Sequence, residues 1–168
     1  GTNYDFTVDW GDGSGDENFS GIGSSLNPTH DYSGTGGVGT YVVTISGDFP
    51  RMYFNGGGDA IKLTSVDQWG DISWTSMSNS FNGCINLNSV ASVNNGQDDP
   101  DLLLVTAAGR MFFGCTSFNN DIESWDVTSI QLFTGMFEGA STYNSPLNSW
   151  EIFSAQNLSG MFANTSFD

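Results

Sequence analysis

Few side chains of this sequence could carry out catalysis. His30 is the single histidine, and it would have to serve as the base of any Ser-His-Asp triad. Serine and aspartate are common throughout the chain, so their presence alone is no signal. A serine nucleophile is typically exposed on a sharp Gly-x-Ser-x-Gly turn, and the sequence contains no such segment. We therefore expect no catalytic residue, no cofactor-binding residue and no enzyme activity.

Two acidic, loop-like segments could bind calcium weakly. Asp9 and Asp12 stand in a glycine-rich stretch, and Asp98, Asp99 and Asp101 stand in a polar stretch that contains proline. Carboxylate oxygens are ligands that Ca²⁺ takes, but neither spacing is that of an EF-hand. The competing interpretation is that these aspartates hydrogen-bond backbone N–H groups in tight turns. Calcium is the only ion that these two segments suggest.

The two cysteines could form a covalent or metal-bound pair. Cys84 and Cys115 are the only cysteines. Three interpretations stay open: two small buried residues, since free cysteine packs like a small apolar side chain; a disulfide between neighbouring segments; or a two-cysteine metal site. The last has little support, because no histidine or further cysteine accompanies the pair. None of the three implies catalysis.

Both cysteines belong to a segment that recurs four times. The copies are Ser80-Phe81-Asn82-Gly83-Cys84, Met111-Phe112-Phe113-Gly114-Cys115, Met136-Phe137-Glu138-Gly139-Ala140 and Met161-Phe162-Ala163-Asn164-Thr165. The shared phenylalanine therefore stands at positions 81, 112, 137 and 162, with one longer step followed by two equal ones. A period of this size is typical of a solenoid, whose turns bury their apolar faces by stacking on one another.

Other residues keep the same period. In three units a tryptophan stands at the same distance before the shared phenylalanine; the second unit lacks it, and we expect Val93 to take its place. Residues that recur at every turn usually stack on the next one, so we expect a buried structural ladder rather than a tryptophan platform for sugars. Its members would be Trp69, Trp125, Trp150, Phe81, Phe112, Phe137, Phe162, Cys84 and Cys115.

The local patterns suggest what each turn contains. Alternating apolar residues at 147–150 and 129–132 predict short strands, and the i, i+3, i+4 spacing within 133–139 predicts a single helical turn. We therefore predict a mainly β fold with short helical turns: a leucine-rich-repeat-like solenoid over 56–168. Its four turns would lie near 61–87, 88–118, 119–143 and 144–168.

The recurring segment resembles a known family. The run Met111-Phe112-Phe113-Gly114-Cys115-Thr116-Ser117-Phe118-Asn119, followed by Trp125-Asp126-Val127-Thr128, is similar to the repeat of BspA-like leucine-rich repeat surface proteins. The resemblance covers about residues 61–168. It implies a bacterial protein that is secreted or displayed at the cell surface and takes part in adhesion or protein–protein contact. The second unit departs from the repeat, with no tryptophan and an acidic insert at 94–101.

The first part of the chain follows a different pattern. Residues 4–10 and 40–45 alternate or are β-branched in the way of strands, with glycine-rich turns between them. Three blocks, at 8–13, 30–33 and 39–45, resemble part of a PKD domain, which is Ig-like and antiparallel. The resemblance implies that His30 is a structural residue near a strand start. We predict a PKD-like β cap over 1–55, whose last strands join the first solenoid turn, and a chain that is a fragment of a longer exported protein.

Composition narrows the possible partners. The net charge is −16, with three lysines and arginines in total. Nucleic acids and anionic membranes require clustered cations, so both are expected to be excluded. No apolar stretch is long enough for a membrane-spanning helix. The aromatic content of 14% favours a packed fold over an acidic disordered tail.

The function expected from these features is a non-catalytic, surface-displayed repeat module that contacts a protein or glycan on another cell or matrix. Two alternatives are a structural spacer within a large surface protein and a calcium-dependent carbohydrate-binding module. Inserted loops are not needed for stacking, so we expect the insert at 94–101 to make contacts with partners and its deletion to leave thermal stability nearly unchanged.

Overall fold

The computed structural model describes residues 3–22, 26, 28–35 and 37–168. The chain divides into two compact units, Gly1–Pro50 and Arg51–Asp168. The boundary lies a few residues before the expected one at 55, because the segment after Pro50 already bonds within the second unit. Phe54 N–H donates to the carbonyl of Ser80 (3.3 Å), and the Ser80 hydroxyl donates to the carbonyl of Met52 (3.1 Å).

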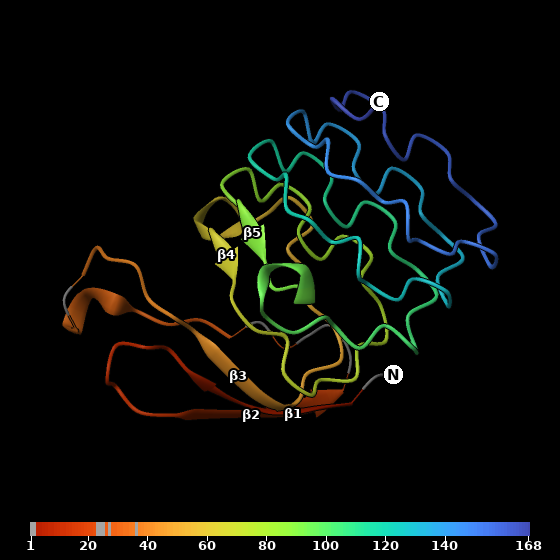
Figure 1. Cartoon of the computed structure of the whole chain (residues 1–168). Coiled ribbons are helices and arrows are strands. Elements are labelled where there is room, and N and C mark those ends of the chain that lie inside the picture. The colour runs from red at the N-terminus through yellow and green to blue at the C-terminus, as the bar shows by residue number, and fades with distance from the viewer. Residues whose placement is uncertain (1–2, 23–25, 27, 36) are drawn as a thin grey trace. The chain divides into compact units, whose positions relative to one another are not determined.

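The first unit contains a three-stranded antiparallel sheet. Its strands are β1 (Asn3–Asp9), β2 (Glu17–Ile22) and β3 (Thr44–Asp48), in the order β2-β1-β3 (Figure 1). Alternation along β1 buries Phe6 and Val8. The ring of Phe6 contacts Phe19 and Phe49, at centroid distances of 5.4 Å and 4.9 Å. This small aromatic cluster is the core of the sheet.

The third strand starts later than the sequence pattern suggests. Strand character was expected from residue 40, but β3 begins at Thr44. Tyr41 instead packs locally: its ring stacks on Tyr32 at 4.2 Å, and its hydroxyl donates to the carbonyl of Gly37. Tyr32 itself begins the short 3₁₀ helix η1 (Tyr32–Gly34). These local contacts replace the sheet pairing that the β-branched pattern predicted.

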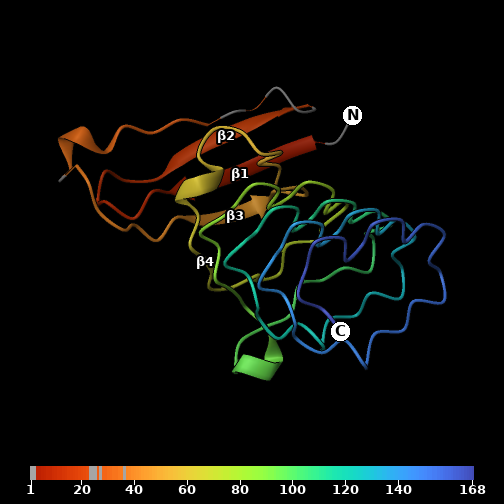
Figure 2. The same cartoon turned by 90° about the horizontal axis from the view of Figure 1, so that it is seen from above.

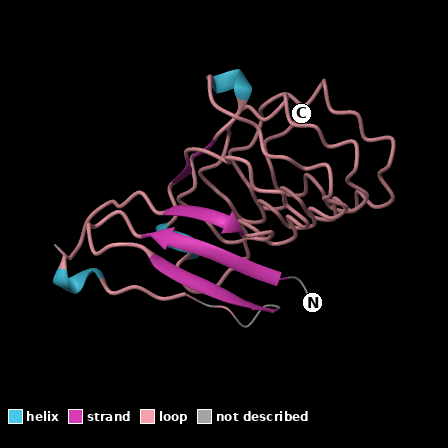
Figure 3. Ribbon diagram, turned by 90° about the horizontal axis from the view of Figure 1, so that it is seen from below, coloured by secondary structure: helices cyan, strands magenta, loops and turns pink. Residues whose placement is uncertain are grey.

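The second unit has little regular secondary structure. It contains η2 (Ala60–Lys62), β4 (Ser65–Val66), β5 (Ser89–Val90) and η3 (Val93–Asn95), and β4 and β5 pair in parallel. The rest of its path is loops and turns (Figure 3). Taken over the described residues, the chain is mainly β with a few short helical turns, as predicted.

Backbone hydrogen bonds join segments that lie one repeat apart. Phe112 N–H donates to the carbonyl of Met136, and Phe137 N–H donates to that of Met161, at 2.8 and 2.9 Å. Alternate residues make equivalent bonds along three successive segments, with donors Met77, Asn79, Phe81, Gly83; Ala108, Arg110, Phe112, Gly114; and Phe133, Gly135, Phe137, Gly139. These segments run side by side in both views (Figures 1 and 2). Each therefore donates four parallel bonds to the next.

The expected short strands are reduced to single bridges or replaced by turns. Leu132 forms isolated parallel bridges with Ala107 and Asn157, so the strand predicted at 129–132 shrinks to a single bridging residue. The strand predicted at 147–150 is wrong: Trp150 N–H donates to the carbonyl of Leu147 (3.1 Å), which closes a turn. A lone strand segment has no ladder to satisfy its polar groups, and turns satisfy them locally.

Candidate interaction surface

The shared phenylalanines lie on top of one another. Phe81, Phe112, Phe137 and Phe162 form three consecutive stacked pairs, each with centroids 5.5 Å apart. The first three are fully buried. Stacking of large rings excludes water and adds ring–ring attraction. This column therefore joins successive copies of the repeat through ring contacts.

Trp69 and Trp125 are also core residues, whereas Trp150 is partly exposed, and the arrangement of the three differs from the expected column. Trp69 and Trp125 contact one another edge to face, at 5.5 Å, although a whole repeat unit lies between them in sequence. Val93, expected to fill the tryptophan place in that unit, is 55% exposed because it lies in η3. Trp150 packs against Phe133 and Phe137. Trp69 and Trp125 are buried, so they offer no face on which a sugar could stack.

Both cysteines are buried free thiols. The Cys115 thiol donates to the carbonyl of Phe81 at 3.1 Å, one turn earlier. Burial raises the pKa of Cys84 to about 12 and raises that of Cys115 as well. Thiols in this state are poor nucleophiles and poor metal ligands, since both roles need the thiolate. The cysteines pack within the stack.

The calcium candidates are occupied by hydrogen bonds to backbone or neighbouring side chains. Asp9 accepts from Gly11 N–H at 2.9 Å. Asp101 accepts from Leu103 N–H at 3.1 Å. Asp12 accepts from Ser14 N–H and from side chains of the first unit. These are the turn contacts that compete with metal binding for a carboxylate.

Asp98 and Asp99 hold the insert in place through hydrogen bonds. Asp98 Oδ2 accepts from Trp69 N–H (3.0 Å) and Gly70 N–H (2.7 Å), and Asp99 Oδ1 accepts from Val93 N–H (3.0 Å). Across the described residues, no three His, Cys, Asp or Glu side chains gather in a way that could hold a metal ion. The described acidic residues that the sequence singled out therefore form no cluster of this kind.

His30 lies in the first unit between two carboxylates. Its Nε2 is 2.7 Å from Asp12 Oδ2, its Nδ1 is 3.4 Å from Glu17 Oε1, and its ring stacks on Trp10 at 4.9 Å. The hydrogen bond to Asp12 is the main reason why the pKa of His30 is raised above 6.5. The pKa of Asp12 is held below its usual range, mainly by hydrogen bonds from Ser14 and Thr35. Both ring nitrogens face carboxylates, which describes a structural ion pair and not a base poised on a hydroxyl.

The insert is bonded to its neighbours on both sides. Ser92 and Asn95 form a reciprocal capping box around η3. Asn94 Nδ2 donates to Asp121 Oδ1 (3.0 Å), and Gln97 Nε2 donates to the carbonyl of Asp67 (3.0 Å). Together with the Asp98 contacts, these bonds tie the insert to the preceding and following units. The expectation that the insert is dispensable for stability is therefore revised: we now expect its deletion to destabilise the second unit.

A short hydrogen-bonded turn recurs in three of the repeat units and remains exposed in each. It is closed by bonds from Val105 N–H to Leu102, from Ile130 to Val127 and from Ala155 to Ile152. The first residue inside each turn is Leu103, Thr128 or Phe153. Leu103 is 69% exposed and Phe153 is 89% exposed. We call these three residues the outer turn column; two of them, Leu103 and Phe153, are large apolar side chains that are exposed in the described chain.

Residues 49–168 match a known family, described as "Mycoplasma protein of unknown function, DUF285". The chain belongs to the DUF285 family. It is a repeat family related to the BspA-like surface proteins. No curated protein and no solved structure matches the chain.

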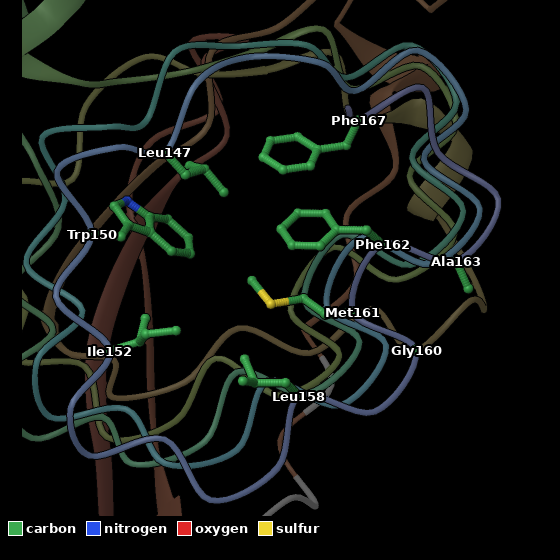
Figure 4. A pocket seen from close by; sticks show the side chains of 9 residues that line it. All are labelled: Leu147, Trp150, Ile152, Leu158, Gly160, Met161, Phe162, Ala163 and Phe167. Atoms are coloured by element: carbon green, nitrogen blue, oxygen red, sulfur yellow. The ribbon is translucent and has the colours of Figure 1, made fainter.

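The last segment of this DUF285 chain carries an open apolar hollow of about 480 Å³. Leu147, Trp150 and Ile152 line one side, and Leu158, Met161 and Phe162 line the other (Figure 4). Within the described residues, no helix is long and apolar enough to cross a membrane.

Sequence reasoning missed two features of this DUF285 chain. The outer turn column was hidden because its members, Leu103, Thr128 and Phe153, differ in type, although their even spacing along the sequence was a usable signal. The hollow was hidden because its lining residues occupy repeat positions that are buried elsewhere. In both features, side chains at a recurring position are exposed instead of being packed as the period predicts.

Proposed function

We propose that this DUF285 chain is a non-catalytic repeat module, displayed at a cell surface, that binds a protein or glycan on another cell or matrix. In this proposal residues 56–168 form a leucine-rich-repeat-like solenoid of about four turns, of the BspA-like type. Residues 1–55 are a PKD-like β module. The alternatives are a spacer with no ligand of its own and a calcium-dependent carbohydrate-binding module.

The observation that carries the proposal is that each repeat has one set of buried side chains and another set of exposed, variable side chains. Side chains at the shared positions, such as Phe112 and Phe137, are buried against their neighbours. Side chains of the outer turn column are exposed and change from Leu103 to Thr128 to Phe153. A rigid stack that presents variable residues at a fixed spacing is how repeat proteins build broad binding surfaces. Exposed leucine and phenylalanine at such positions favour a binder over a spacer.

Charge limits the partner class. The net charge of −16 disfavours nucleic acids and other polyanions and favours basic or neutral partners. Phe153 and Leu103 would supply the apolar contact area, since large exposed apolar residues contribute most at the centre of an interface. The insert, with Val93 half exposed in η3, would widen the contact surface.

The described side chains offer little for an enzyme. A histidine base would need a hydroxyl nucleophile within hydrogen-bond reach, whereas His30 is bonded to Asp12 and faces Glu17. The two thiols are buried with raised pKa values. These findings support a binding role, and the display of the module outside the cell is inferred from the family relationship.

The test is a binding screen with matched variants. Purified protein is presented to arrays of extracellular-matrix proteins and glycans, with parallel measurements in calcium and in chelator. We expect at least one protein or glycan ligand whose binding falls at least about ten-fold in the double variant Leu103→Ser/Phe153→Ser, which is a loss of about 1.4 kcal/mol. Ile61→Ser, at a 56% exposed apolar residue of η2, is the control and should bind normally.

The outcomes separate the candidates. No binding to any array would contradict the proposal and favour a spacer. Glycan binding that is lost in chelator would favour the calcium-dependent module. Binding that survives the double variant unchanged would place the contact surface elsewhere and contradict the role of the outer turn column.

A further inference from the structure

Backbone hydrogen bonds hold the exposed turns in register. The outer turn column lies on three turns, at 102–105, 127–130 and 152–155. Gln131 N–H donates to the carbonyl of Thr106 at 2.9 Å, and Gln156 N–H donates to that of Gln131 at 2.8 Å. Each of these residues directly follows one of the turns. The bonds therefore place the three turns at corresponding positions of successive copies of the repeat.

The column is exposed in the middle of the chain as well as in its last copy. Leu103 is 69% exposed and its neighbour Leu104 is 59% exposed, although two further copies of the turn follow them in the sequence. Thr128, with one further copy after it, is also exposed. Exposure is therefore a property of this position in the repeat, and Phe153 places a ring at the same position.

An acidic residue precedes each member of the column by two positions. These residues are Asp101, Asp126 and Glu151, all exposed, and we call them the acidic column. Asp101 Oδ1 accepts from Leu103 N–H (3.1 Å), and Asp126 Oδ1 accepts from Thr128 N–H (3.0 Å). Hydrogen bonds from Thr128 also hold the pKa of Asp126 below its usual range. A stripe of negative charge therefore runs beside the apolar stripe.

The described chain does not neutralise the acidic column. The sequence has three lysines and arginines in total, and among the described residues the only one in an ion pair is Lys62, with Asp59. Like charges at neighbouring places of a ladder repel one another. The acidic column therefore costs stability in the free protein, and a positively charged partner would relieve that cost.

The spacing of the copies matches the pitch of an α-helix. Segments paired in this way lie about 4.8 Å apart, and the stacked rings of successive copies have centroids 5.5 Å apart. One turn of an α-helix advances by about 5.4 Å. Two residues of a β-strand advance by about 6.7 Å, so alternate side chains of a strand would lose register with the copies. A helix laid along the column keeps it.

We propose that the outer turn column and the acidic column together dock a basic amphipathic α-helix of a partner protein. Side chains at i, i+3, i+4 and i+7 share one face of a helix. Lysines or arginines at such positions lie over the acidic column, and the neighbouring apolar stripe of the helix lies over Leu103, Leu104 and Phe153. The inference rests on the proposed function, because it names the partner chemistry of the same surface.

Other occupants fit these observations less well. A calcium ion needs several carboxylate oxygens at one point, and no three acidic side chains of the described residues gather in that way. A neutral glycan could stack on Phe153 but would leave the acidic column without compensation. An extended basic peptide has the right charge but the wrong spacing. A basic helix satisfies the apolar stripe, the charge and the spacing together.

The experiment uses the full chain and a synthetic helical peptide as the probe. The peptide carries a lysine stripe beside a leucine stripe on one face. A covalent staple on the opposite face keeps it helical, since short isolated helices are marginal in water. Calorimetry measures the affinity, and NMR shift changes in the labelled protein locate the site. We expect binding that weakens with added salt and shift changes concentrated at 101–105, 126–130 and 151–155.

Neutral variants of the same shape test the role of charge. Asp101→Asn, Asp126→Asn and Glu151→Gln are combined in one protein; an amide oxygen still accepts the N–H bonds of the turns. We expect the affinity for the lysine peptide to fall at least about ten-fold, because three ion pairs are lost together. An unchanged thermal unfolding midpoint, or a higher one, shows that the triple variant is folded.

A matched variant controls for total charge. Asp5→Asn, Asp16→Asn and Asp48→Asn remove the same number of negative charges from exposed sites of the first unit. This variant should bind the lysine peptide normally. If it loses as much affinity as the first triple variant, the attraction belongs to the net charge of the chain and the inference is wrong.

Two control peptides test the geometry. One has the composition of the probe with its lysines spread around all faces of the helix. The other is an extended peptide in which lysine alternates with threonine. Both should bind at least about ten-fold more weakly than the probe, since they match the charge of the surface but not its spacing.

Three results would overturn the inference: no measurable binding of the lysine peptide, equal affinity of the acidic-column variant, or equal affinity of either control peptide. The proposed function has its own readout. An array ligand that is lost in Leu103→Ser/Phe153→Ser, but binds the acidic-column variant normally in a protein that ignores the lysine peptide, would leave the adhesion role standing and overturn this inference alone.

Discussion

The rings of Phe112 and Phe137 lie stacked, with centroids 5.5 Å apart and planes 10° from parallel, although the two residues belong to different copies of the repeat. Backbone bonds run beside the rings, from Phe112 N–H to Met136 and from Phe137 N–H to Met161. Apolar stacking and backbone pairing therefore act at the same place. The second unit depends on this junction for its order, since it has little regular secondary structure.

Truncating a central ring should be costly. Phe137 is fully buried and stacks on Phe112, Tyr143 and Phe162. We expect Phe137→Ala to lower the free energy of unfolding by about 3–5 kcal/mol, as loss of a large buried side chain does. Urea titration followed by tryptophan fluorescence measures it. Phe153→Ala, at an 89% exposed ring, is the control; equal losses in both variants would contradict a buried column.

A buried hydroxyl should be replaceable at a gain. Tyr143 is fully buried, and its hydroxyl finds no hydrogen-bond partner among the described residues. Phe118 and Phe167 pair with the shared phenylalanine in the same way and carry no hydroxyl. We expect Tyr143→Phe to raise the free energy of unfolding by about 1 kcal/mol or more, because an unsatisfied buried polar group is removed. A clear loss of stability would mean that the hydroxyl does have a partner in solution.

Anchoring of the insert should depend on one carboxylate. Asp98 accepts hydrogen bonds from Trp69 N–H and Gly70 N–H. We expect Asp98→Ala to destabilise the second unit by about 1–3 kcal/mol, because both donors lose their acceptor. Asp71→Ala, at an exposed aspartate nearby in sequence, should have almost no effect in the same thermal unfolding experiment. If the two variants behave alike, the insert is not held in this way.

The ion pair of the first unit should make its stability depend on pH. The pKa of His30 is raised above 6.5 in the folded state, so its contribution is complete below 6.5 and is lost as pH rises through the raised value. The pKa of Asp12 is lowered from 3.8, so its contribution is present above 3.8 and is lost as pH falls through the lowered value. The pair therefore stabilises the first unit most between about 3.8 and 6.5.

NMR titration of the imidazole protons tests this pair directly. We expect a His30 pKa above 6.5 in the unaltered chain and a lower value in Asp12→Asn, which removes the main acceptor. Asp16→Asn changes an exposed carboxylate of the same loop and should leave the titration curve in place. An identical curve for all three proteins would show that the contact between His30 and Asp12 does not form.

The sequence period predicted the parts of the structure that repeat. The stacking of Phe81, Phe112 and Phe137 follows from it, because residues at the same position of successive repeats come to lie next to one another. The contact between Trp69 and Trp125 could not be predicted, since it depends on the path of the insert. Only the structure shows that the Val93 side chain is exposed and that the Asp98 carboxylate accepts a hydrogen bond from Trp69 N–H.

Local patterns were weaker guides than the period. Alternation at 147–150 predicted a strand, but a short segment without a hydrogen-bonded partner satisfies its polar groups in a turn. The calcium site that the acidic segments suggested stays a prediction; in the structure Asp9 and Asp101 accept from N–H groups two residues later, and Asp98 accepts from Trp69 N–H. Composition alone cannot distinguish a carboxylate that accepts backbone hydrogen bonds from one that binds a metal ion.

The most direct test of the account is detection of the hydrogen bonds between turns. Scalar couplings across hydrogen bonds, measured by NMR on the full labelled chain, report which amide nitrogen bonds to which carbonyl carbon. Stacked turns predict couplings from Phe81 to Met111, from Phe112 to Met136 and from Phe137 to Met161. Couplings from these amides only to carbonyls nearby in sequence, or fast exchange at all three, would contradict the stack and with it the proposed binding surface.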